Sequence, residues 1–318
     1  MPHDVIVTAV RERPPTATKV SLADFLAREF PPRQNLLAPW LPEQGLCMVY
    51  APRGVGKTYF ALSVAYAVAS GGRFLNWHAP EPQGVLYLDG EMPATVMQER
   101  LAAIVKGADQ EPAAPFELVT PDLQERGVPR LDTAAGQAAI EELITPQTKL
   151  IVCDNLSTLT SGAENDGDEW LPVQSWALSQ RAQGRSVLLI HHAGKSGQQR
   201  GTSRREDVLD TVISLKRPTG YTPDQGAAFE IHFEKGRGIY GDDTLPIEAT
   251  LTETSDGGLV WASRTLEAST LDKVVKLTRE GLNQPEIADA LDINKSTVSR
   301  HLKKARSTGL LSAQDVLP

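Results

Sequence analysis

The sequence has only two cysteines in 318 residues, Cys47 and Cys153, and each lies inside an apolar run. There is no CxxC pair, so a zinc or redox site has little support, and two buried thiols in a reducing compartment are expected. No segment reaches the ~20 apolar residues that a membrane-spanning helix needs. The first residues, MPHDVIVTAVRERPP, lack the apolar run of a secretion signal. These absences predict a cytoplasmic protein that does not contact a membrane.

The sequence also lacks the overall positive charge that is typical of many nucleic-acid-binding proteins. It has 32 Lys and Arg against 40 Asp and Glu, which gives a net charge of −8. Any basic surface must therefore be local. With 41% hydrophobic and 23% charged residues, the composition is that of an ordinary globular protein. The length exceeds one typical domain, so we expect one large domain and a small one.

Short apolar runs alternate with helical patterns between residues 45 and 192. The expected strands cover residues 45–50, 84–92, 116–121, 149–155 and 186–192. The expected helices cover residues 57–72, 95–108, 134–144 and 169–184. Apolar strands that alternate with helices form mostly parallel sheets covered on both faces, so we predict an α/β fold of this kind.

The segments on either side of this region have other patterns. Residues 1–40 are proline-rich and irregular, with one short helix expected in 21–30, where Ser21 is the cap and Asp24 follows three residues later. After residue 192, strand-like runs follow one another without helices, which indicates an antiparallel extension of the sheet. These runs are 208–217, 227–236, 245–254 and 257–263.

Residues 51–58, APRGVGKT, have the spacing of a phosphate-binding loop, GxxxxGK followed by Ser or Thr, except that Ala51 replaces the first glycine. In such loops the backbone N–H groups and the helix N-terminus face the phosphates, the lysine reaches the β- and γ-phosphates, and the hydroxyl binds Mg²⁺. The loop lies between an expected strand and an expected helix. We therefore predict a nucleoside triphosphate site rather than a glycine-rich turn with an incidental lysine. The expected contacts are Ala51, Pro52, Arg53, Gly54, Val55, Gly56, Lys57, Thr58 and Tyr59.

Hydrolysis also needs a carboxylate on Mg²⁺, a group that orients water and an added cation. Asp154 follows the apolar run LIVC, where a metal-ordering aspartate would lie together with the hydroxyl of Thr58. Glu91 follows the strand VLYLD, at the sheet edge where ligands of open α/β folds collect. A strand end and a solvated glutamate are the alternatives for these two. Together with Lys57 they make Glu91 the candidate for activating water, with Asp89 as the rival.

The motifs APRGVGKT, YLDGE, LIVCD and LLIHH, in this order, resemble those of the RecA-like ATPases, and most of all the RepA-type hexameric helicases of plasmids and other mobile elements. The resemblance covers residues 36–262. It implies ATP as the nucleotide, Glu91 as the group that polarises water, and a γ-phosphate sensor at His191 or His192. Which histidine has this role stays open, and a histidine pair satisfied at a strand end is the alternative.

The same resemblance implies hydrolysis between subunits of a ring. The segment EKGRG is similar to the KxR pair of replicative helicases related to DnaB, so Lys235 and Arg237 are expected to act on the neighbouring subunit, with Arg237 as the finger. The alternative is two solvated charges.

The polar segment 193–207 occupies the place of the family's pore loop. It has no aromatic residue, so phosphate contact rather than base stacking is expected with a single strand in the ring channel. The expected cations are Lys195, Arg200, Arg204 and Arg205, with hydroxyls from Ser196, Thr202 and Ser203.

The last fifty residues have the pattern of a helix-turn-helix: a helix closed by Gly281, a short helix, a turn at 292–294 and a polar-faced helix. The string NQPEIADALDINKSTVSRHLKKARSTGLL resembles winged helix-turn-helix modules of bacterial regulators, whose last helix enters the major groove of duplex DNA. From Ser269 the segment has eight Lys and Arg against six Asp and Glu, or +2, which leaves −10 for the rest. A three-helix protein–protein module is the alternative. The expected DNA contacts are Lys295, Ser296, Thr297, Ser299, Arg300 and Lys303.

We therefore predict an N-terminal arm (1–40), a RecA-like ATPase domain (41–262), and a linker with a helix-turn-helix domain (263–318). The leading hypothesis is an Mg²⁺-dependent, ATP-hydrolysing DNA motor of the RepA-like replicative helicase class, assembled as a homo-hexameric ring. Such a motor needs no duplex-reading domain to move along a single strand. The alternatives are an ATP-dependent DNA-binding regulator or helicase loader, a binding module with a degenerate site, and a recombinase-type filament.

Overall fold

The computed structural model describes residues 17–161, 167–194 and 206–312. The chain divides into two units, residues 1–33 and 34–318. In the first unit the helix α1 (Leu22–Leu26) begins after Ser21, whose hydroxyl accepts the backbone N–H of Asp24 at 3.1 Å. The predicted cap is therefore present, and the helix ends sooner than the sequence pattern indicated.

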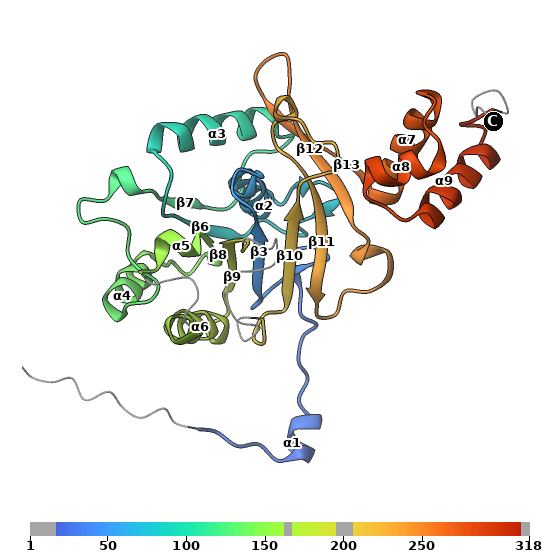
Figure 1. Cartoon of the computed structure of the whole chain (residues 1–318). Helices are drawn as coiled ribbons and strands as arrows, with labels where there is room; N and C mark the ends of the chain where they lie inside the picture. The colour runs from blue at the N-terminus through green and yellow to red at the C-terminus, as the bar shows by residue number, and fades with distance from the viewer. Residues whose placement is uncertain (1–16, 162–166, 195–205, 313–318) are drawn as a thin grey trace, which may run out of the picture. The chain divides into compact units, whose positions relative to one another are not determined.

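The second unit is built on a central sheet that has nine strands within the described residues (Figure 1). In spatial order the strands are β13 (Leu259–Thr265), β12 (Ile247–Glu253), β11 (Ala228–Gly236), β10 (Thr211–Lys216), β3 (Leu46–Ala51), β9 (Ser186–His192), β8 (Thr148–Asp154), β6 (Gly84–Asp89) and β7 (Phe116–Val119). The six strands from β10 to β7 are parallel, and β11, β12 and β13 are antiparallel. The predicted mostly parallel sheet with an antiparallel extension is confirmed. The first run of the expected extension, β10, instead pairs in parallel with β3.

Helices cover both faces of the parallel part (Figure 1). Side chains from α2 and α3 pack with one set of alternating strand residues, and side chains from α4, α5 and α6 pack with the other set. The strands are buried on both faces, which explains why the sequence shows continuous apolar runs. The helices are α2 (Lys57–Ser70), α3 (Ala94–Gly107), α4 (Ala134–Leu143), α5 (Leu156–Leu159) and α6 (Gly167–Ala182). Short 3₁₀ turns are η1 (Pro121–Leu123), η3 (Pro223–Gln225) and η4 (Gly241–Thr244).

The helix α2 is almost entirely buried, as its uniformly apolar sequence predicts. It ends at Gly71, where φ is +67°, a left-handed cap that glycine adopts without a Cβ clash. An aromatic cluster around Phe60 fixes its position, with Trp40 at 6.2 Å and Phe229 at 6.1 Å between ring centroids. In the part of the chain that the structure describes, no helix is long and apolar enough to cross a membrane.

The N-terminal boundary differs from the expected one at residue 40. Leu36, Leu37 and Trp40 are fully buried in the core of the second unit, because the short strands β1 (Asn35–Leu37) and β2 (Leu41–Pro42) pair there. A second small ribbon, β4 (Arg73–Phe74) with β5 (Trp77–His78), lies beyond α2. The arm therefore ends at residue 33 rather than at residue 40.

The linker expected at residues 262–270 is also different in the structure. Strand β13 continues to Thr265, and Thr265 caps the helix α7 (Leu266–Arg279) directly, its hydroxyl accepting the N–H of Ala268 at 3.2 Å. The helices α8 (Gln284–Leu291) and α9 (Lys295–Ser307) complete the three-helix domain. Most of residues 262–270 are small or polar, which resembles a linker, but residues 262–265 pair with β12 and residues 266–270 form the first turns of α7.

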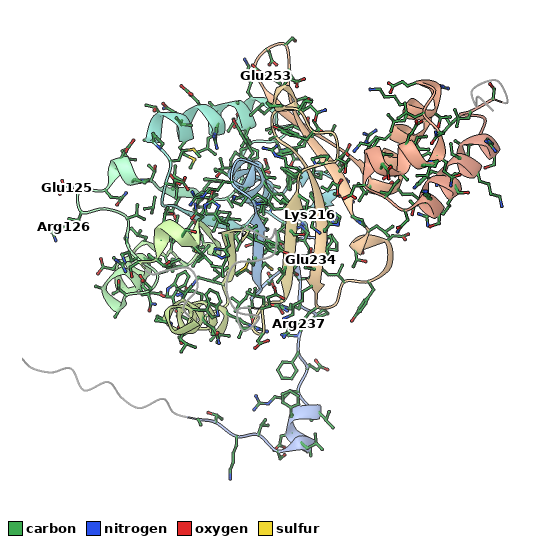
Figure 2. All side chains as sticks on the ribbon, in the orientation of Figure 1. Glu125, Arg126, Lys216, Glu234, Arg237 and Glu253 are labelled. Carbon is green, nitrogen blue, oxygen red and sulfur yellow. The ribbon has the colours of Figure 1, made fainter. Side chains whose placement is uncertain are left out.

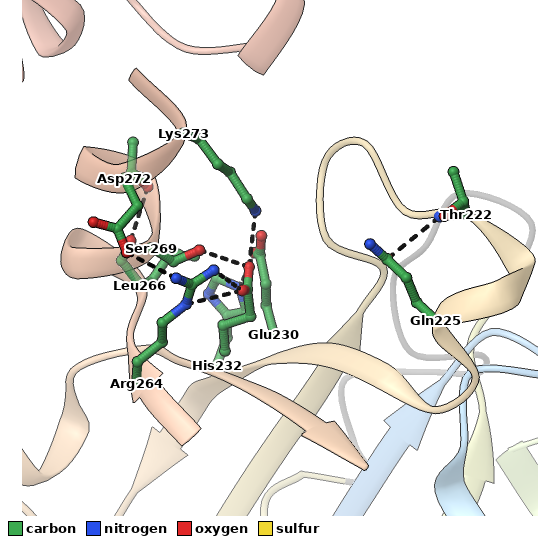
Figure 3. A network of polar contacts seen from close by, with 11 residues as sticks. Thr222, Gln225, Glu230, His232, Arg264, Leu266, Ser269, Asp272 and Lys273 are labelled. Carbon is green, nitrogen blue, oxygen red and sulfur yellow. Dashed lines mark hydrogen bonds and ion pairs between the residues drawn. The ribbon is translucent and has the colours of Figure 1, made fainter. Parts of the chain in front are cut away.

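A buried carboxylate joins this helical domain to the sheet, and Figure 3 labels its partners Arg264, Ser269 and Lys273. Glu248 of β12 accepts from Arg264 of β13 at 2.8 Å, and from Lys273 and Ser269 of α7 at 2.8 Å each. These donors lower the pKa of Glu248, although burial alone would raise it. The carboxylate thus holds two cations and one hydroxyl at the junction.

Replacing Glu248 by Gln should destabilise this junction, because Lys273 would lose its carboxylate partner and Arg264 would keep only its ion pair with Asp272. Because both cations are partly exposed to solvent, we expect the loss to be about 1 kcal/mol. We expect a clear fall in the midpoint of urea unfolding, measured by tryptophan fluorescence. Glu253→Gln is the matched control, since Glu253 is exposed at the end of the same strand (Figure 2). Equal midpoints for the two variants would contradict a stabilising role for Glu248.

Candidate functional site

The loop between β3 and α2 has the backbone that a phosphate-binding loop requires. Gly54 and Gly56 have φ values of +74° and +115°, which side chains other than glycine rarely adopt. Ala51 is the last residue of β3 and is extended, so the missing first glycine costs nothing in backbone conformation. The N-terminus of α2 follows directly at Lys57, where unpaired N–H groups favour an anion. The loop therefore fits a phosphate group.

Lys57 lies at the centre of this loop and is only 7% exposed. Its Nζ donates to the carbonyls of Ala51 at 3.1 Å and Pro52 at 2.9 Å. Burial lowers the pKa of Lys57 to about 8, and Asp154 and Glu91 counteract part of this shift. The ammonium group is thus short of anionic partners, which a triphosphate would supply.

Asp154 ends β8 and is almost completely buried. Its Oδ2 accepts from the Tyr87 hydroxyl at 2.7 Å, and a hydrogen bond also joins it to Thr58. Burial raises the pKa of Asp154, while these hydrogen bonds and Lys57 lower it. The Thr58 hydroxyl and the Asp154 carboxylate therefore place two hard oxygen ligands side by side, which suits Mg²⁺. Among the described residues no group of three His, Cys, Asp or Glu could hold a metal alone, so phosphate oxygens would have to complete the shell.

The two rival carboxylates have different surroundings. Asp89 is buried and accepts the N–H groups of Glu91 and Met92 at 3.1 and 3.2 Å, as well as the Thr120 hydroxyl at 3.2 Å. Burial raises the pKa of Asp89 to about 6, against these hydrogen bonds. Glu91 is exposed, and its Oε2 accepts from the Asn155 amide at 2.7 Å. Asp89 therefore fixes the turn that presents Glu91. Among the described residues, the second carboxylate oxygen of Glu91, Oε1, has no hydrogen-bond partner.

The two histidines at the end of β9 lie on opposite faces of the sheet. His191 pairs with Tyr50 and His192 with Ala51, so strand alternation puts His192 on the same face as the phosphate loop. Burial, Lys57 and Arg53 lower the pKa of His192 to about 4, so its ring is neutral at pH 7. Its Nδ1 has no hydrogen-bond partner among the residues described. Of the pair, His192 is the one that can meet a nucleotide.

These side chains converge on one cavity of about 640 Å³. It is lined by Lys57, Thr58, Asp154, Glu91 and His192. Residues that the sequence analysis did not identify also line it, namely Asn155, Val96, Arg100 and Tyr221. Asn155 had a usable signal, since it follows Asp154 directly. Arg100 and Tyr221 lie outside any motif and reach the cavity only through the folded chain.

Lys235 and Arg237 do not contribute to the cavity of their own chain. Both lie near the end of the sheet where β3 begins, because Gly236 pairs with Thr211, and Thr211 pairs with Cys47. Figure 2 labels Arg237 at this end. Lys235 donates to the carbonyl of Glu206, and Arg237 donates to that of Asp207 at 2.8 Å. The phosphate loop follows the opposite end of β3. Action on a neighbouring subunit remains the prediction for these two residues.

The expected pore-loop residues lie outside the described part of the chain. They are Lys195, Arg200, Arg204 and Arg205, with the hydroxyls of Ser196, Thr202 and Ser203. The loop leaves β9 after His192 and returns before β10 at Thr211. A single-strand contact there remains a prediction.

The C-terminal helices have the expected helix-turn-helix order. Asn283 and Glu286 form a capping box at the start of α8, and Asp292 turns the chain with a φ of +50° before α9. Val298 and Ala305 are fully buried on the inner face of α9. The outward side chains are exposed at Lys295, Ser296, Ser299, Arg300 and Lys303, and partly exposed at Thr297.

One buried residue of α9 was not anticipated. His301 is 2% exposed, and burial lowers its pKa, with Arg300 and Lys304 lowering it further and Glu267 opposing them. His301 therefore binds a proton less readily in the folded domain than in the unfolded chain, where its pKa has the ordinary value of 6.5. By linkage, the contribution of His301 to stability is complete above that pH and is lost as the pH falls below it.

His301→Gln should accordingly reduce the acid sensitivity of the fold. We expect the drop in unfolding temperature between pH 7.5 and pH 5.5 to be smaller in this variant than in the wild type. His78→Gln, a change at an exposed histidine, should leave the drop unchanged. The same drop in all three proteins would show that His301 does not titrate in this range.

Two family models match the sequence. An AAA domain model matches residues 11–198, more than half of the chain, and a homeodomain-like domain model matches residues 273–312. No curated protein matches the chain.

Several solved structures are similar in fold. The flagellar accessory protein FlaH from Methanocaldococcus jannaschii is 12% identical, with a TM-score of 0.45 over 70% of this chain and 90% of that one. The KaiC-like protein PH0186 from Pyrococcus horikoshii OT3 is 14% identical, with a TM-score of 0.47 over 71% and 93%. A RadB recombinase is 17% identical, with a TM-score of 0.43 over 66% and 88%. The match to the AAA domain model spans the phosphate loop, both acidic strand ends and the histidine pair, and on this ground the chain belongs to the AAA domain family, with a helix-turn-helix domain at its C-terminal end.

Proposed function

We propose that this protein is an Mg²⁺-dependent ATPase that acts on DNA as a motor, in the class of RepA-like replicative helicases, and assembles as a homo-hexameric ring in the cytoplasm. The observation that carries the proposal is the convergence of Lys57, Asp154, Glu91 and His192 on one cavity, in a chain that also has a basic recognition-type helix. The narrower assignment to replicative helicases of mobile elements is supported by the sequence motifs.

Each residue of the cavity has one task in this proposal. The phosphate loop binds the triphosphate, and Lys57 neutralises its charge. Thr58 and Asp154 would hold Mg²⁺, which supplies charge neutralisation at the phosphates when bound. Glu91 orients and polarises the attacking water, and Asn155 holds the Glu91 carboxylate in place. His192, neutral and with Nδ1 available, links the γ-phosphate position to the loop that follows β9.

Two surfaces would contact DNA. The polar loop 193–207 would bind the backbone of a single strand within the ring, through charge rather than base stacking. The exposed face of α9 would enter the major groove of a duplex and bring Arg300 and Lys303 to the DNA. Arg237 of one subunit would complete the site of the next subunit.

A regulator or helicase loader is the second candidate, and one observation favours it. The helix-turn-helix domain is held to the sheet through Glu248 rather than by a free linker. A duplex-binding domain joined in this way suits a protein in which the bound nucleotide controls the affinity for a DNA site. In that case ATP binding would change DNA affinity without strand separation.

The steady-state ATPase rate, measured without DNA, with single strands and with duplex, tests the proposal. A motor predicts strong stimulation by single strands and displacement of a labelled strand from a forked duplex. Lys57→Ala is the negative control and should lose both activities. Stimulation by duplex alone, without displacement, would move the assignment to the regulator or loader. No turnover under any condition would refute both candidates.

The duplex contact has its own control within the chain. Arg300→Glu with Lys303→Glu should weaken duplex binding and reduce its salt dependence, because two phosphate contacts are lost. Arg126→Glu, a charge reversal at an exposed site on the ATPase domain, should not change duplex affinity specifically (Figure 2). Equal losses from both variants would indicate nonspecific attraction rather than recognition by α9.

A further inference from the structure

The arrangement of strands fixes the direction in which a nucleotide must lie across the phosphate loop. His192 and Asp154 are the last residues of β9 and β8, and Glu91 follows β6; these three strands all lie on one side of β3. The hydrolytic groups of the proposed function therefore gather on that side, and the γ-phosphate must point towards it. The ribose and base would then extend the other way, towards the side of β3 where β10 lies.

The loop between β10 and β11, residues 217–227, lies on that side. Strand β10 is parallel to β3, so its last residues are at the same edge as the phosphate loop. Arg217 begins the loop and donates to the carbonyl of Gly54. Ala227 ends it, so close to the phosphate loop that a Cβ on Gly56 would come within 3.1 Å of the Ala227 Cβ. Both ends of the loop therefore rest against the phosphate loop.

Tyr221 projects from this loop into the nucleotide cavity, and its position is fixed by local contacts. The guanidinium carbon of Arg217 lies 3.8 Å from the centroid of the Tyr221 ring, and the Tyr221 hydroxyl donates to the Gly226 carbonyl at 2.9 Å. The next residues form a 3₁₀ turn closed by a capping box between Thr222 and Gln225 (Figure 3). The ring is thus held before any ligand arrives, with one face on Arg217.

We infer that Tyr221 is the stacking platform for the base of the nucleotide, and that Arg217 is a positioning residue that holds the ring and ties it to the phosphate loop. This inference rests on the proposed nucleotide site. The guanidinium covers one face of the ring, and the ring lines the cavity, where a planar base could stack on it. Stacking on an aromatic ring tolerates every base, because each has a π-face. The platform therefore contributes affinity for the nucleoside part without choosing between adenine and guanine.

The test compares ligands that do and do not carry a base. Calorimetric titration of the full chain with ATP, GTP and inorganic tripolyphosphate, each with Mg²⁺, separates the base from the phosphates. Tyr221→Ala should weaken ATP and GTP by roughly 10- to 100-fold, the loss that corresponds to one aromatic–base stack. Its affinity for tripolyphosphate should stay within about twofold of the wild type, since the phosphate loop is intact.

Variants at matched positions exclude a simple folding defect. Tyr221→Phe keeps the ring and should retain most of the ATP affinity. Arg217→Met removes the guanidinium and should weaken ATP less than Tyr221→Ala does. Tyr240→Ala, at a residue that is 79% exposed after β11, is the control for removing a tyrosine and should change nothing.

The outcomes separate this inference from the proposed function. Unchanged ATP affinity in Tyr221→Ala, or equal losses for ATP and tripolyphosphate, would overturn the platform. A wild type that binds ATP by stacking on Tyr221 but does not hydrolyse it or respond to DNA would refute the proposed function and leave the platform standing. A wild type that binds neither ATP nor GTP would overturn both.

Discussion

Glu91→Gln is expected to lower the rate of ATP hydrolysis at saturating ATP by about a hundredfold or more, the usual contribution of a positioned general base. The amide keeps the size of the side chain and can still contact Asn155, so ATP affinity should change little. The measurement is steady-state release of phosphate, together with the dissociation constant for ATP. A loss of turnover with retained binding identifies Glu91 as a residue that acts after the nucleotide is bound.

Asp89→Asn is the matched variant for the rival carboxylate. Asp89 accepts backbone N–H groups from Glu91 and Met92, so its replacement should loosen the turn. We expect a lower unfolding temperature and a partial loss of turnover, since Glu91 would be less well placed. Full turnover in Glu91→Gln combined with a complete loss in a stably folded Asp89→Asn would reverse the two roles.

Arg237→Ala is expected to lower ATP turnover by about a thousandfold in the assembled protein, the effect of removing a finger that stabilises charge on the transferring phosphoryl group. Arg237 cannot reach the nucleotide cavity of its own subunit, because it lies near the end of the sheet where β3 begins, and the phosphate loop follows the other end of β3. Its contact with the Asp207 carbonyl leaves the guanidinium partly exposed. The measurement is phosphate release at protein concentrations above those needed for assembly, with ATP affinity as the second readout.

A mixing experiment tests whether Arg237 acts in trans. An Arg237→Ala subunit keeps Glu91, and a Glu91→Gln subunit keeps Arg237, so a mixed interface can hold one complete site. Equal mixtures of the two inactive variants should regain a substantial part of the wild-type turnover. Mixtures of Glu91→Gln with the double variant should regain none. Recovery in neither mixture would mean that Arg237 does not complete a neighbour's site.

The parallel core was predictable from the sequence because its strands are buried on both faces. Such burial leaves continuous apolar runs such as LIVC before Asp154, and these runs mark where the strands end. The phosphate loop, Asp154 and Glu91 all follow strand ends, so the rule that ligands collect at the carboxyl edge was enough to place them together. Strand alternation then shows that His192, and not His191, is on the face of the phosphate loop, once the register with Tyr50 and Ala51 is known.

Features that depend on contacts between residues far apart in the sequence could not be predicted from local sequence patterns. Trp40 belongs to the core because it packs on Phe60 and Trp77, and its neighbouring prolines gave the appearance of an arm. The first part of the supposed linker, residues 262–265, is a strand because β12 pairs with it residue by residue. Tyr221 reaches the cavity because β10 happens to pair in parallel with β3, and no local pattern records that pairing.

If the helix-turn-helix domain binds duplex DNA as proposed, the junction at Glu248 constrains which spacings of DNA sites the protein can bind. Two recognition helices on flexible tethers accept binding sites at almost any separation, but helices held by β13 and the Glu248 cluster do not. In an oligomer, the separation and rotation between copies of α9 follow from the contact between the ATPase domains. A duplex repeats its groove about every 10 base pairs. Increasing the separation of two DNA sites by half of that repeat would place one site on the opposite side of the duplex. Two α9 helices held at a fixed separation could then not bind both sites.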